Sequence, residues 1–185
     1  MENGACSYRR FLEGDESGIV EIVREYRDGL MLYLNGFVRN IHTAEDLAED
    51  TFVKLVAKRP RYDERYSFRT WLYTIGRNTA LDELRRRKRR TETGLEKAED
   101  LPSDEESVER AYLKQEERIL LYRAMDRLRE EYRQVLYLHY IEGLRNEETA
   151  RIMRKNRRQV ENLLYRAKTA LRGELEKEGI FDENI

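Results

Sequence analysis

The side chains best suited to specific chemistry lie in residues 157–168. This stretch carries seven basic, amide or tyrosine side chains: Arg157, Arg158, Gln159, Asn162, Tyr165, Arg166 and Lys168. Arginine can donate two hydrogen bonds to guanine, glutamine and asparagine can pair similarly with adenine, and arginine or lysine can neutralise phosphates. These residue types predict a helix that binds duplex DNA. From spacing alone, an ordinary surface helix remains the alternative.

A second group of candidate side chains, in residues 61–90, interleaves aromatic and basic residues. Its members are Tyr62, Tyr66, Phe68, Trp71 and Tyr73 among Arg61, Arg65, Arg69, Arg77 and the basic run Arg85–Arg90. Aromatic rings can stack on unpaired bases while arginines hold the backbone, so the group favours binding of unpaired nucleic acid. A core position is the alternative for Phe68 and the favoured interpretation of Trp71, and the basic run can also be a solvated helix end.

The third group consists of four carboxylates: Glu45, Asp46, Glu49 and Asp50. Negative charge is favoured near a helix N-terminus by the helix dipole, which is the simplest interpretation of this group. Acid–base catalysis is a poorer one, because no set of apolar and polar partners accompanies the carboxylates. We interpret His139, which lies in an apolar run, as a core histidine.

Several classes of protein are disfavoured by what the sequence lacks. A single cysteine, Cys6, excludes a disulfide framework, and two distant histidines make a zinc site improbable, so we expect no metal or cofactor. The sequence has no GxGxxG, GxxxxGK[ST] or GxSxG motif, and we expect no catalytic activity. No apolar run approaches the ~18 residues of a membrane span, and no signal-peptide pattern precedes the first helix. We therefore expect a soluble, cytoplasmic protein without membrane insertion.

Charge is segregated along the chain although the totals nearly cancel. The 185 residues include 36 basic and 37 acidic side chains. Residues 91–109 hold 1 basic and 8 acidic side chains, whereas the segments on either side each carry a net charge of +3. With Gly94 and Pro102 and no apolar period, this middle segment is predicted to be a solvated acidic linker. We expect domains at residues 1–90 and 110–185.

Apolar spacing predicts that the candidate groups lie on helices. Steps of three and four predict helices over 19–41 and 44–58, the second capped by Thr43 with Asp46 three residues later. Residues 60–67 lack a period and are predicted to be a loop, with Ser67 as the cap of the next helix. In that helix we expect Trp71, Leu72, Ile75, Leu81 and Leu84 to face the core, and Arg69, Tyr73 and Arg77 to form another face.

The second half of the sequence also has a helical pattern. Apolar residues between Val108 and Leu128 predict one helix, and those from Tyr132 to His139 a second, which Gly143 ends. Residues 146–153, a three-residue break and a helix from Arg157 follow the layout of a helix-turn-helix motif, with Ala150 at the helix crossing. The predicted fold is therefore all-α, with two small helical domains.

Two stretches closely resemble region 2 of bacterial sigma factors: TAEDLAEDTFVKL (43–55) and YSFRTWLYTIGRNTALDELRRRKRR (66–90). Within residues 125–171, the stretches MDRLREEYRQVLYLHYIEGL (125–144), EETARIM (147–153) and RRQVENLLYRAKTAL (157–171) resemble region 4. Two motif blocks in the family's order, with no recognisable region 1 or 3, resemble an extracytoplasmic-function (ECF) sigma factor of the sigma-70 family. This resemblance implies a transcription initiation factor that directs core RNA polymerase to specific promoters.

The resemblance also implies roles for the candidate residues. The helix that carries Asp46, Leu47, Glu49, Asp50 and Phe52 matches the part that grips the β′ clamp helices of polymerase. The segment matching minus-ten recognition and melting contains Tyr62, Arg65, Tyr66, Ser67, Phe68, Arg69, Trp71, Arg77, Asn78, Arg85 and Arg86. Residues 157–168 match the minus-thirty-five reader. Further implied partners are the polymerase β flap and a cognate anti-sigma factor, and the linker would follow the RNA path of the enzyme.

Three positions depart from the family pattern: Arg145 replaces the usual Ser or Thr cap, Arg154 replaces Gly, and Lys155 replaces an apolar residue. They bear on the turn geometry and on the register of the recognition helix. Two other functions remain as alternatives to that of a sigma factor. A free-standing helix-turn-helix regulator would bind duplex DNA without polymerase and has no use for the aromatic residues of 61–90. An RNA-binding adaptor would use both basic segments but not the acidic group.

Overall fold

The structure of the protein is a computed structural model that describes residues 3–92 and 116–177. Every regular element in these two stretches is helical, so the all-α prediction is confirmed. The chain divides into two units, residues 1–103 and 104–185, each described below by itself. The exact domain limits stay a prediction, and the predicted linker lies outside the described residues except for Thr91 and Glu92, which extend the preceding helix.

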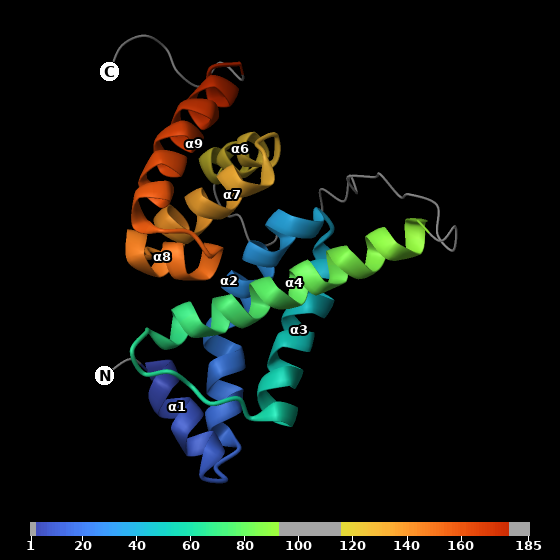
Figure 1. The fold of residues 1–185 in the computed structure, drawn as a ribbon, viewed down its shortest axis with the longest axis vertical. Helices are drawn as coiled ribbons and strands as arrows, with labels where there is room; N and C mark the ends of the chain where they lie inside the picture. Colours follow the sequence, from blue (N-terminus) through green and yellow to red (C-terminus); the bar gives the residue numbers. More distant parts are fainter. Residues whose placement is uncertain (1–2, 93–115, 178–185) are drawn as a thin grey trace. The chain divides into compact units, whose positions relative to one another are not determined.

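The described part of the first unit consists of α1 (Asn3–Leu12), α2 (Ser17–Val38), α3 (Ile41–Lys58) and α4 (Phe68–Glu92). Helix α2 contacts each of the others, and α4 lies across α2 and α3 (Figure 1). The core between them is made mainly of large side chains that are almost fully buried: Ile22, Leu30, Tyr33, Leu34, Leu55 and Leu72. The predicted helices over 19–41 and 44–58 thus correspond to α2 and α3.

The first turn of α3 corrects a predicted cap. Asn40 is the N-cap, and its Oδ1 accepts a hydrogen bond from the backbone N–H of Thr43 at 2.9 Å. The helix therefore begins at Ile41, and the Thr43 hydroxyl instead accepts from Nη2 of Arg87 at 3.2 Å. A threonine with an acid three residues later fits a capping box, but an asparagine just upstream is at least as good an N-cap.

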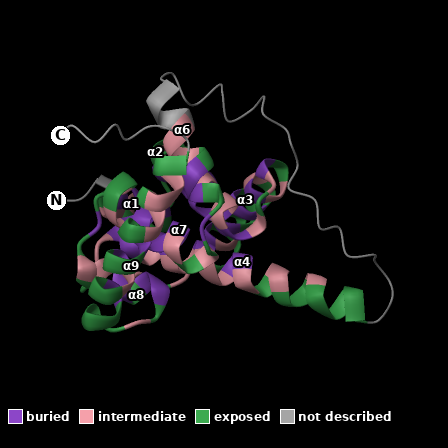
Figure 2. Ribbon diagram, turned by 90° about the horizontal axis from the view of Figure 1, so that it is seen from above, coloured by how far each residue is buried: buried purple, intermediate pink, exposed green. Residues whose placement is uncertain are grey.

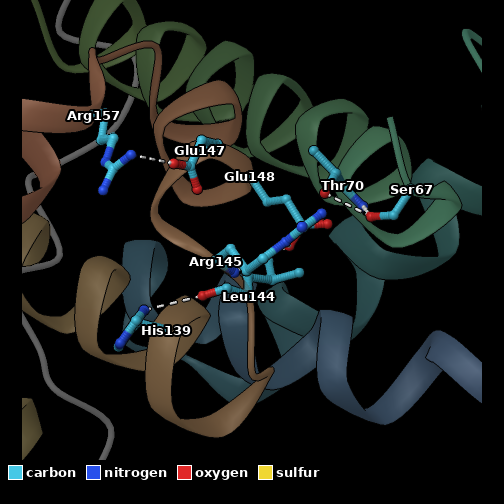
Figure 3. A network of polar contacts seen from close by, with 8 residues as sticks. All are labelled: Ser67, Thr70, His139, Leu144, Arg145, Glu147, Glu148 and Arg157. Carbon is cyan, nitrogen blue, oxygen red and sulfur yellow. Dashed lines mark hydrogen bonds and ion pairs between the residues drawn. The ribbon is translucent and has the colours of Figure 1, made fainter. Parts of the chain in front are cut away.

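The faces of α4 also differ from the prediction. Tyr73, expected beside two arginines, is 1% exposed and its ring packs against that of Tyr33, with centroids 5.3 Å apart. Trp71, Ile75, Leu81 and Leu84, expected in the core, are only half-buried. Buried residues occur in the first half of the helix, and its last turns are mostly exposed (Figure 2). Ser67 caps α4 as predicted, its Oγ accepting from the Thr70 N–H at 3.2 Å (Figure 3).

Helix α1 was not predicted from the sequence. Its side chains Tyr8 and Phe11 are 1% and 4% exposed, so the helix contributes to the core of the first unit. The contact with α2 is close because both helices meet at a glycine: a Cβ on Gly18 would lie 2.1 Å from the Ser7 carbonyl oxygen. Tyr8 and Phe11 at a spacing of three, followed by Gly14, could have indicated this short helix.

The described part of the second unit begins with α6 (Glu116–Asp126), α7 (Glu130–Leu136) and one π-helical turn, η1 (Tyr137–Ile141). Gly143, with φ of +66°, ends this segment as predicted, and the remaining elements are α8 (Asn146–Met153) and α9 (Arg157–Lys177). The predicted helix from Val108 is described only from Glu116 onward; its earlier residues lie outside the described part. The helix-turn-helix limits 146–153 and 157 onward are confirmed.

Helices α8 and α9 pack on α7 and η1 through apolar side chains. Val135, Leu138, Ile152, Val160 and Ala167 are all fully buried, and Ala150 is 6% exposed where a small side chain was predicted. His139 is half-buried rather than fully buried, and its Nδ1 lies 3.0 Å from the carbonyl oxygen of Leu144 (Figure 3).

No helix within the described ranges is long and apolar enough to cross a membrane. The same ranges contain no group of His, Cys, Asp and Glu side chains arranged to hold a metal ion.

The turn between α8 and α9 contains the residues that depart from the usual motif. Arg154 adopts a left-handed conformation with φ of 54° and ψ of 44°, the region that favours glycine. Lys155 donates its backbone N–H to the Ala150 carbonyl at 2.9 Å, and its Nζ forms an ion pair with Glu131 at 2.9 Å. The turn therefore keeps the expected geometry despite its two basic residues, at the cost of backbone strain at Arg154.

Replacing Arg154 by glycine should stabilise the second unit. Left-handed backbone costs a non-glycine residue about 1–2 kcal/mol, and glycine removes this cost. The greater conformational freedom of glycine in the unfolded chain lowers the stability by about 0.4–1 kcal/mol, which offsets part of the gain. We expect Arg154→Gly to raise the free energy of opening by about 0.5–1 kcal/mol, measured by hydrogen exchange at α8 and α9 amides. Arg154→Ala is the control, because it keeps the strain. Equal stabilisation by both variants would contradict this explanation.

Candidate nucleic-acid interface

Helix α9 presents a continuous exposed stripe on the side away from its core contacts. Val160, Leu164 and Ala167 face inward, whereas Arg158, Asn162, Tyr165 and Arg166 are exposed, Tyr165 at 76%. Lys168 is exposed as well. Residues spaced by three and four share one face of a helix, so the structure brings four of the seven predicted side chains together along one edge of α9.

Gln159 belongs to the cap of α9 rather than to this stripe. Its backbone N–H donates to Oδ1 of Asn156 at 2.8 Å, and its side-chain Oε1 accepts from the Asn156 N–H at 2.8 Å. This reciprocal pair is a capping box, and bidentate recognition of adenine would need the same amide oxygen. We therefore reassign Gln159 to positioning α9. An asparagine followed three residues later by glutamine could have indicated this from the sequence.

Arg157 is also partly engaged within the protein. Its guanidinium forms an ion pair with Glu161 at 2.8 Å. A second ion pair joins it to Glu147 of α8 at 3.0 Å (Figure 3). The hydrogen bond to Glu161 and the charge of Glu147 raise the pKa of Arg157 above its usual value. Because two carboxylates already offset its charge, Arg157 is better placed to tie α8 to α9 than to contact bases.

The loop of residues 59–67 lies before α4 and is ordered by its own side chains. The Tyr62 hydroxyl donates to the Tyr66 carbonyl at 2.5 Å, and Asp63 accepts from the Arg65 guanidinium at 2.6 Å. The Arg65 guanidinium also lies 5.9 Å from the centre of the Tyr66 ring. The structure thus brings together the predicted loop residues Tyr62, Arg65, Tyr66 and Ser67 next to the start of α4.

An aromatic cluster joins this loop to the helices. The centroid of the Phe68 ring lies 5.6 Å from that of Tyr62 and 5.4 Å from that of Trp71. The centroids of Tyr62 and Trp71 are 5.3 Å apart. Phe68 is 0% exposed, so its predicted contact with DNA is corrected: its ring is part of the core. Tyr62, Tyr66 and Trp71 are half-buried and keep aromatic surface available to a base.

Basic side chains continue along α4 beyond the cluster. Arg69 lies over the Tyr26 ring at 5.6 Å, and Arg77 and Asn78 are half-buried. The Nε of Arg77 is buried and has no hydrogen-bond partner in the described part of the chain. Because this N–H is buried, it cannot itself contact DNA, and the role of Arg77 in minus-ten recognition stays a prediction.

The basic run at the end of α4 is only partly neutralised. Arg85 pairs with Asp82 at 3.1 Å, and Glu83 pairs with Arg86 and with Arg87, the latter at 3.0 Å. Burial opposes ionisation of Glu83, but the hydrogen bonds from Arg87 and Arg86 prevail and lower its pKa. Six consecutive basic residues beside Asp82 and Glu83 leave an excess of positive charge on this exposed end.

The acidic group on α3 forms an exposed patch with two valines. Asp46, Glu49 and Asp50 are exposed, and Val53 and Val56 farther along are 60% and 45% exposed. None of the three carboxylates forms an ion pair with another residue of the described ranges. The two valines are not among the predicted site residues, although a step of seven from Asp46 to Val53 and from Glu49 to Val56 places them on the same face as the carboxylates.

Two residues assigned to polymerase contact lie elsewhere. Leu47 and Phe52 are 4% and 6% exposed and pack into the core of the first unit. Their predicted direct contact with polymerase is therefore corrected, since buried side chains can only support the helix that carries the exposed carboxylates.

Comparison with known proteins identifies the two units. The family model for Sigma-70 region 2 matches residues 22–90, and that for Sigma-70, region 4 matches residues 118–171. The chain is 30% identical over 170 residues to the RNA polymerase sigma-H factor of Pseudomonas aeruginosa, covering 88% of each protein. It is 28% identical over 172 residues to the ECF RNA polymerase sigma factor SigW of Bacillus subtilis, covering 88% of this chain and 91% of SigW.

The chain belongs to the ECF sigma factors of the sigma-70 family. It is thus a promoter-specific transcription initiation factor, and the alternative of a free-standing regulator is not supported. The fold agrees with a solved structure of the Bartonella quintana sigma factor RpoE in complex with the anti-sigma factor NepR. That match has a TM-score of 0.67 at 21% identity and covers 84% of this chain and 95% of RpoE.

The stability of this sigma factor should fall as the pH rises from about 10 toward 12 because of Tyr8. Burial raises the pKa of the Tyr8 phenol to about 12, although the charge of Arg59 acts in the opposite direction. The unfolded chain loses this proton first, near the ordinary tyrosine pKa of about 10, so unfolding becomes easier by about 1.4 kcal/mol at pH 11.

Urea unfolding followed by the fluorescence of Trp71, the single tryptophan, measures this change at pH 9 and pH 11. The variant Tyr8→Phe should lose less stability than the wild type over the same interval. An equal loss in both proteins would contradict the assignment to Tyr8.

The exposed stripe of α9 predicts different effects at its two ends. Residues near the N-terminus of a recognition helix enter the major groove first, whereas those farther along meet phosphates. Arg158→Ala should weaken binding to the minus-thirty-five element by about 1–3 kcal/mol and relax the base preference at one or two of its positions. Arg166→Ala should weaken binding to all promoter sequences alike. It should also reduce the salt dependence of the affinity by the amount that corresponds to about one phosphate contact.

Transcription from single-base variants of a minus-thirty-five element, at several salt concentrations, distinguishes these effects. If Arg166→Ala changes the sequence preference and Arg158→Ala does not, the assigned register of α9 is wrong.

Proposed function

We propose that this sigma factor binds core RNA polymerase through the exposed patch of α3 and opens and recognises the minus-ten element with the 59–67 loop and α4. We further propose that α9 binds the minus-thirty-five element. The observation that supports this most is that the two sigma regions occur in order, and that each carries a surface suited to its part of the task.

The α3 patch suits a protein partner better than DNA. Asp46, Glu49 and Asp50 would repel phosphates, while Val53 and Val56 add apolar area that a protein surface can bury. Unpaired carboxylates beside apolar side chains fit a basic and apolar partner, which supports docking on the β′ clamp helices. The β flap is the proposed partner of the second unit.

The loop and the start of α4 suit unpaired DNA. Half-buried Tyr62, Tyr66 and Trp71 offer stacking surface, and the Arg65 guanidinium, which pairs with Asp63, lies 5.9 Å from the centre of the Tyr66 ring. Each base that stacks on an aromatic side chain gains about 1–3 kcal/mol, comparable to the cost of unstacking a base from the duplex. We therefore infer that this region holds a flipped base of the non-template strand while Arg69, Arg77 and the basic end of α4 hold phosphates.

Three further properties belong to the proposal. The protein acts without catalysis of its own, because polymerase performs the chemistry. It works in the cytoplasm, where its polymerase and promoters are. A cognate anti-sigma factor is a further partner, and the solved sigma factor RpoE in complex with NepR is a precedent for that arrangement.

The experiment that tests the proposed function is run-off transcription with core polymerase on a library of genomic fragments. We expect specific initiation at a subset of promoters only when the protein is added. Tight, sequence-specific binding of duplex by the protein alone, without stimulation of polymerase, would favour a regulator instead.

Reversing charge on the α3 patch should abolish initiation. Asp46→Lys with Asp50→Lys places two cations where the partner is proposed to be basic, and exposed substitutions usually change stability by less than about 0.5 kcal/mol. Affinity for core polymerase, measured by fluorescence anisotropy, should fall at least tenfold while thermal unfolding stays unchanged. Glu13→Lys with Glu25→Lys is the matched control, since both carboxylates are exposed in the same unit but lie off α3. Wild-type affinity in the α3 variant would refute the assigned role.

A further inference from the structure

Helix α1 lies outside the matched sigma-70 region, which begins at residue 22, yet it contacts the 59–67 loop directly. We propose that α1 holds this loop in the conformation that accepts an unpaired base, and that Tyr8 is the main positioning residue. The inference rests on the proposed function of the loop. It assigns to α1 a part in single-strand recognition without any contact with DNA.

Two polar contacts connect α1 to the loop. The Tyr8 hydroxyl donates a hydrogen bond to the Pro60 carbonyl oxygen at 2.7 Å, and Nη2 of Arg9 forms an ion pair with Glu64 at 3.1 Å. Proline has no backbone N–H, so its carbonyl is the polar backbone group of that residue that can be fixed by a side chain. The contacts are four residues apart in the loop and hold both its beginning and its middle.

The ring of Tyr8 fixes the aromatic floor of the same region. Its centroid lies 5.1 Å from that of Trp71 and 5.7 Å from that of Phe68. Trp71 also contacts Tyr62 of the loop at 5.3 Å. A shift of Tyr8 would therefore move both the backbone of the loop at Pro60 and Trp71, one of the three rings proposed to offer stacking surface to a base.

Helix α1 is itself held firmly, which a positioning element requires. A Cβ on Gly4 would lie 2.5 Å from Cδ1 of Phe68, so the helix backbone approaches this ring more closely than any other residue type would allow. At Gly18 the approach of α2 to Ser7 is equally close. Ser7 also donates to Oε2 of Glu21 on α2 at 2.7 Å.

The energetic role of these contacts is pre-organisation. A loop that is ordered only on binding loses conformational entropy at that step, which weakens affinity. Where folding has already fixed the loop, this loss is reduced. A single hydrogen bond of ordinary strength corresponds to about a fivefold change in the occupancy of the held conformation.

The test uses holoenzyme, made with core polymerase, and fork DNA that carries a promoter found by run-off transcription. Each non-template nucleotide of the minus-ten element is replaced in turn by an abasic nucleotide. For the wild type we expect one position at which the missing base weakens binding strongly. The affinity for intact fork DNA divided by the affinity for fork DNA abasic at that position measures base capture. Tyr8→Phe should reduce this ratio about fivefold. A general loss of stability would lower both affinities alike and leave the ratio unchanged.

Tyr33→Phe is the matched control, because it removes another buried hydroxyl of the first unit away from the loop, and its ratio should equal that of the wild type. If no abasic position matters for the wild type, the proposed base capture fails. If one matters and Tyr8→Phe keeps the wild-type ratio, the role of α1 is overturned.

A charge exchange provides an independent second test of α1. Arg9→Glu should lower the ratio by repelling Glu64, and adding Glu64→Arg should restore it. Both side chains are more than half exposed, so neither change threatens the fold and the test holds even if Tyr8→Phe fails to fold. A ratio that Arg9→Glu leaves unchanged, or a loss that Glu64→Arg does not restore, counts against the inference.

Discussion

The burial of Phe68 is the interaction on which the first unit depends. Its ring lies at the first position of α4, directly after the Ser67 cap, and is fully enclosed by rings from α1, α2 and the loop. One side chain thus sets where the loop ends, how α4 crosses α2 and where α1 must lie. Removing a buried phenylalanine typically costs about 3–5 kcal/mol, a large part of the stability of a small domain. The aromatic residues proposed to bind DNA are therefore extensions of the core rather than separate surface features.

Local pairing of charges decides which cations remain available for DNA. Glu147 and Glu161 pair with Arg157, which connects α8 to α9, and Glu83 pairs with Arg86 and Arg87 within α4, so the positive charge at these positions is partly offset. Exposed ion pairs add little stability, but they do restrict the direction of long side chains. The near-neutral total charge of the chain consequently conceals an acidic patch on α3, a basic end on α4 and the exposed stripe of α9. Each surface acts through its own local charge, since screening limits charge effects to about 8–10 Å in salt.

The helix-turn-helix unit shows how a motif tolerates unusual residues. Arg154 accepts a strained backbone, while the Lys155 pair with Glu131 and the capping box of Asn156 with Gln159 fix the residues on either side. At the start of α8, Glu148 accepts from the Arg145 backbone N–H at 3.0 Å, so one half of a capping box is present although Arg145 offers no side-chain acceptor to the first N–H groups of the helix. The departures from the family pattern therefore leave the layout of the motif unchanged and assign Gln159 to the turn.

The sequence alone determined the all-α class, the two-unit order, the limits of the helix-turn-helix and the family, because helical periodicity and motif spacing are properties of neighbours along the chain. It could not decide which of several aromatic or polar neighbours lie inside. Phe68 and Tyr73 became core residues because α1 and α2 cover them, and Val53 stayed exposed because no described helix packs there. Likewise, Arg157 has the right chemistry for bases, but its ion pair with Glu147 of α8 partly offsets its charge. Burial and pairing depend on residues distant in sequence, and only the tertiary structure brings these together.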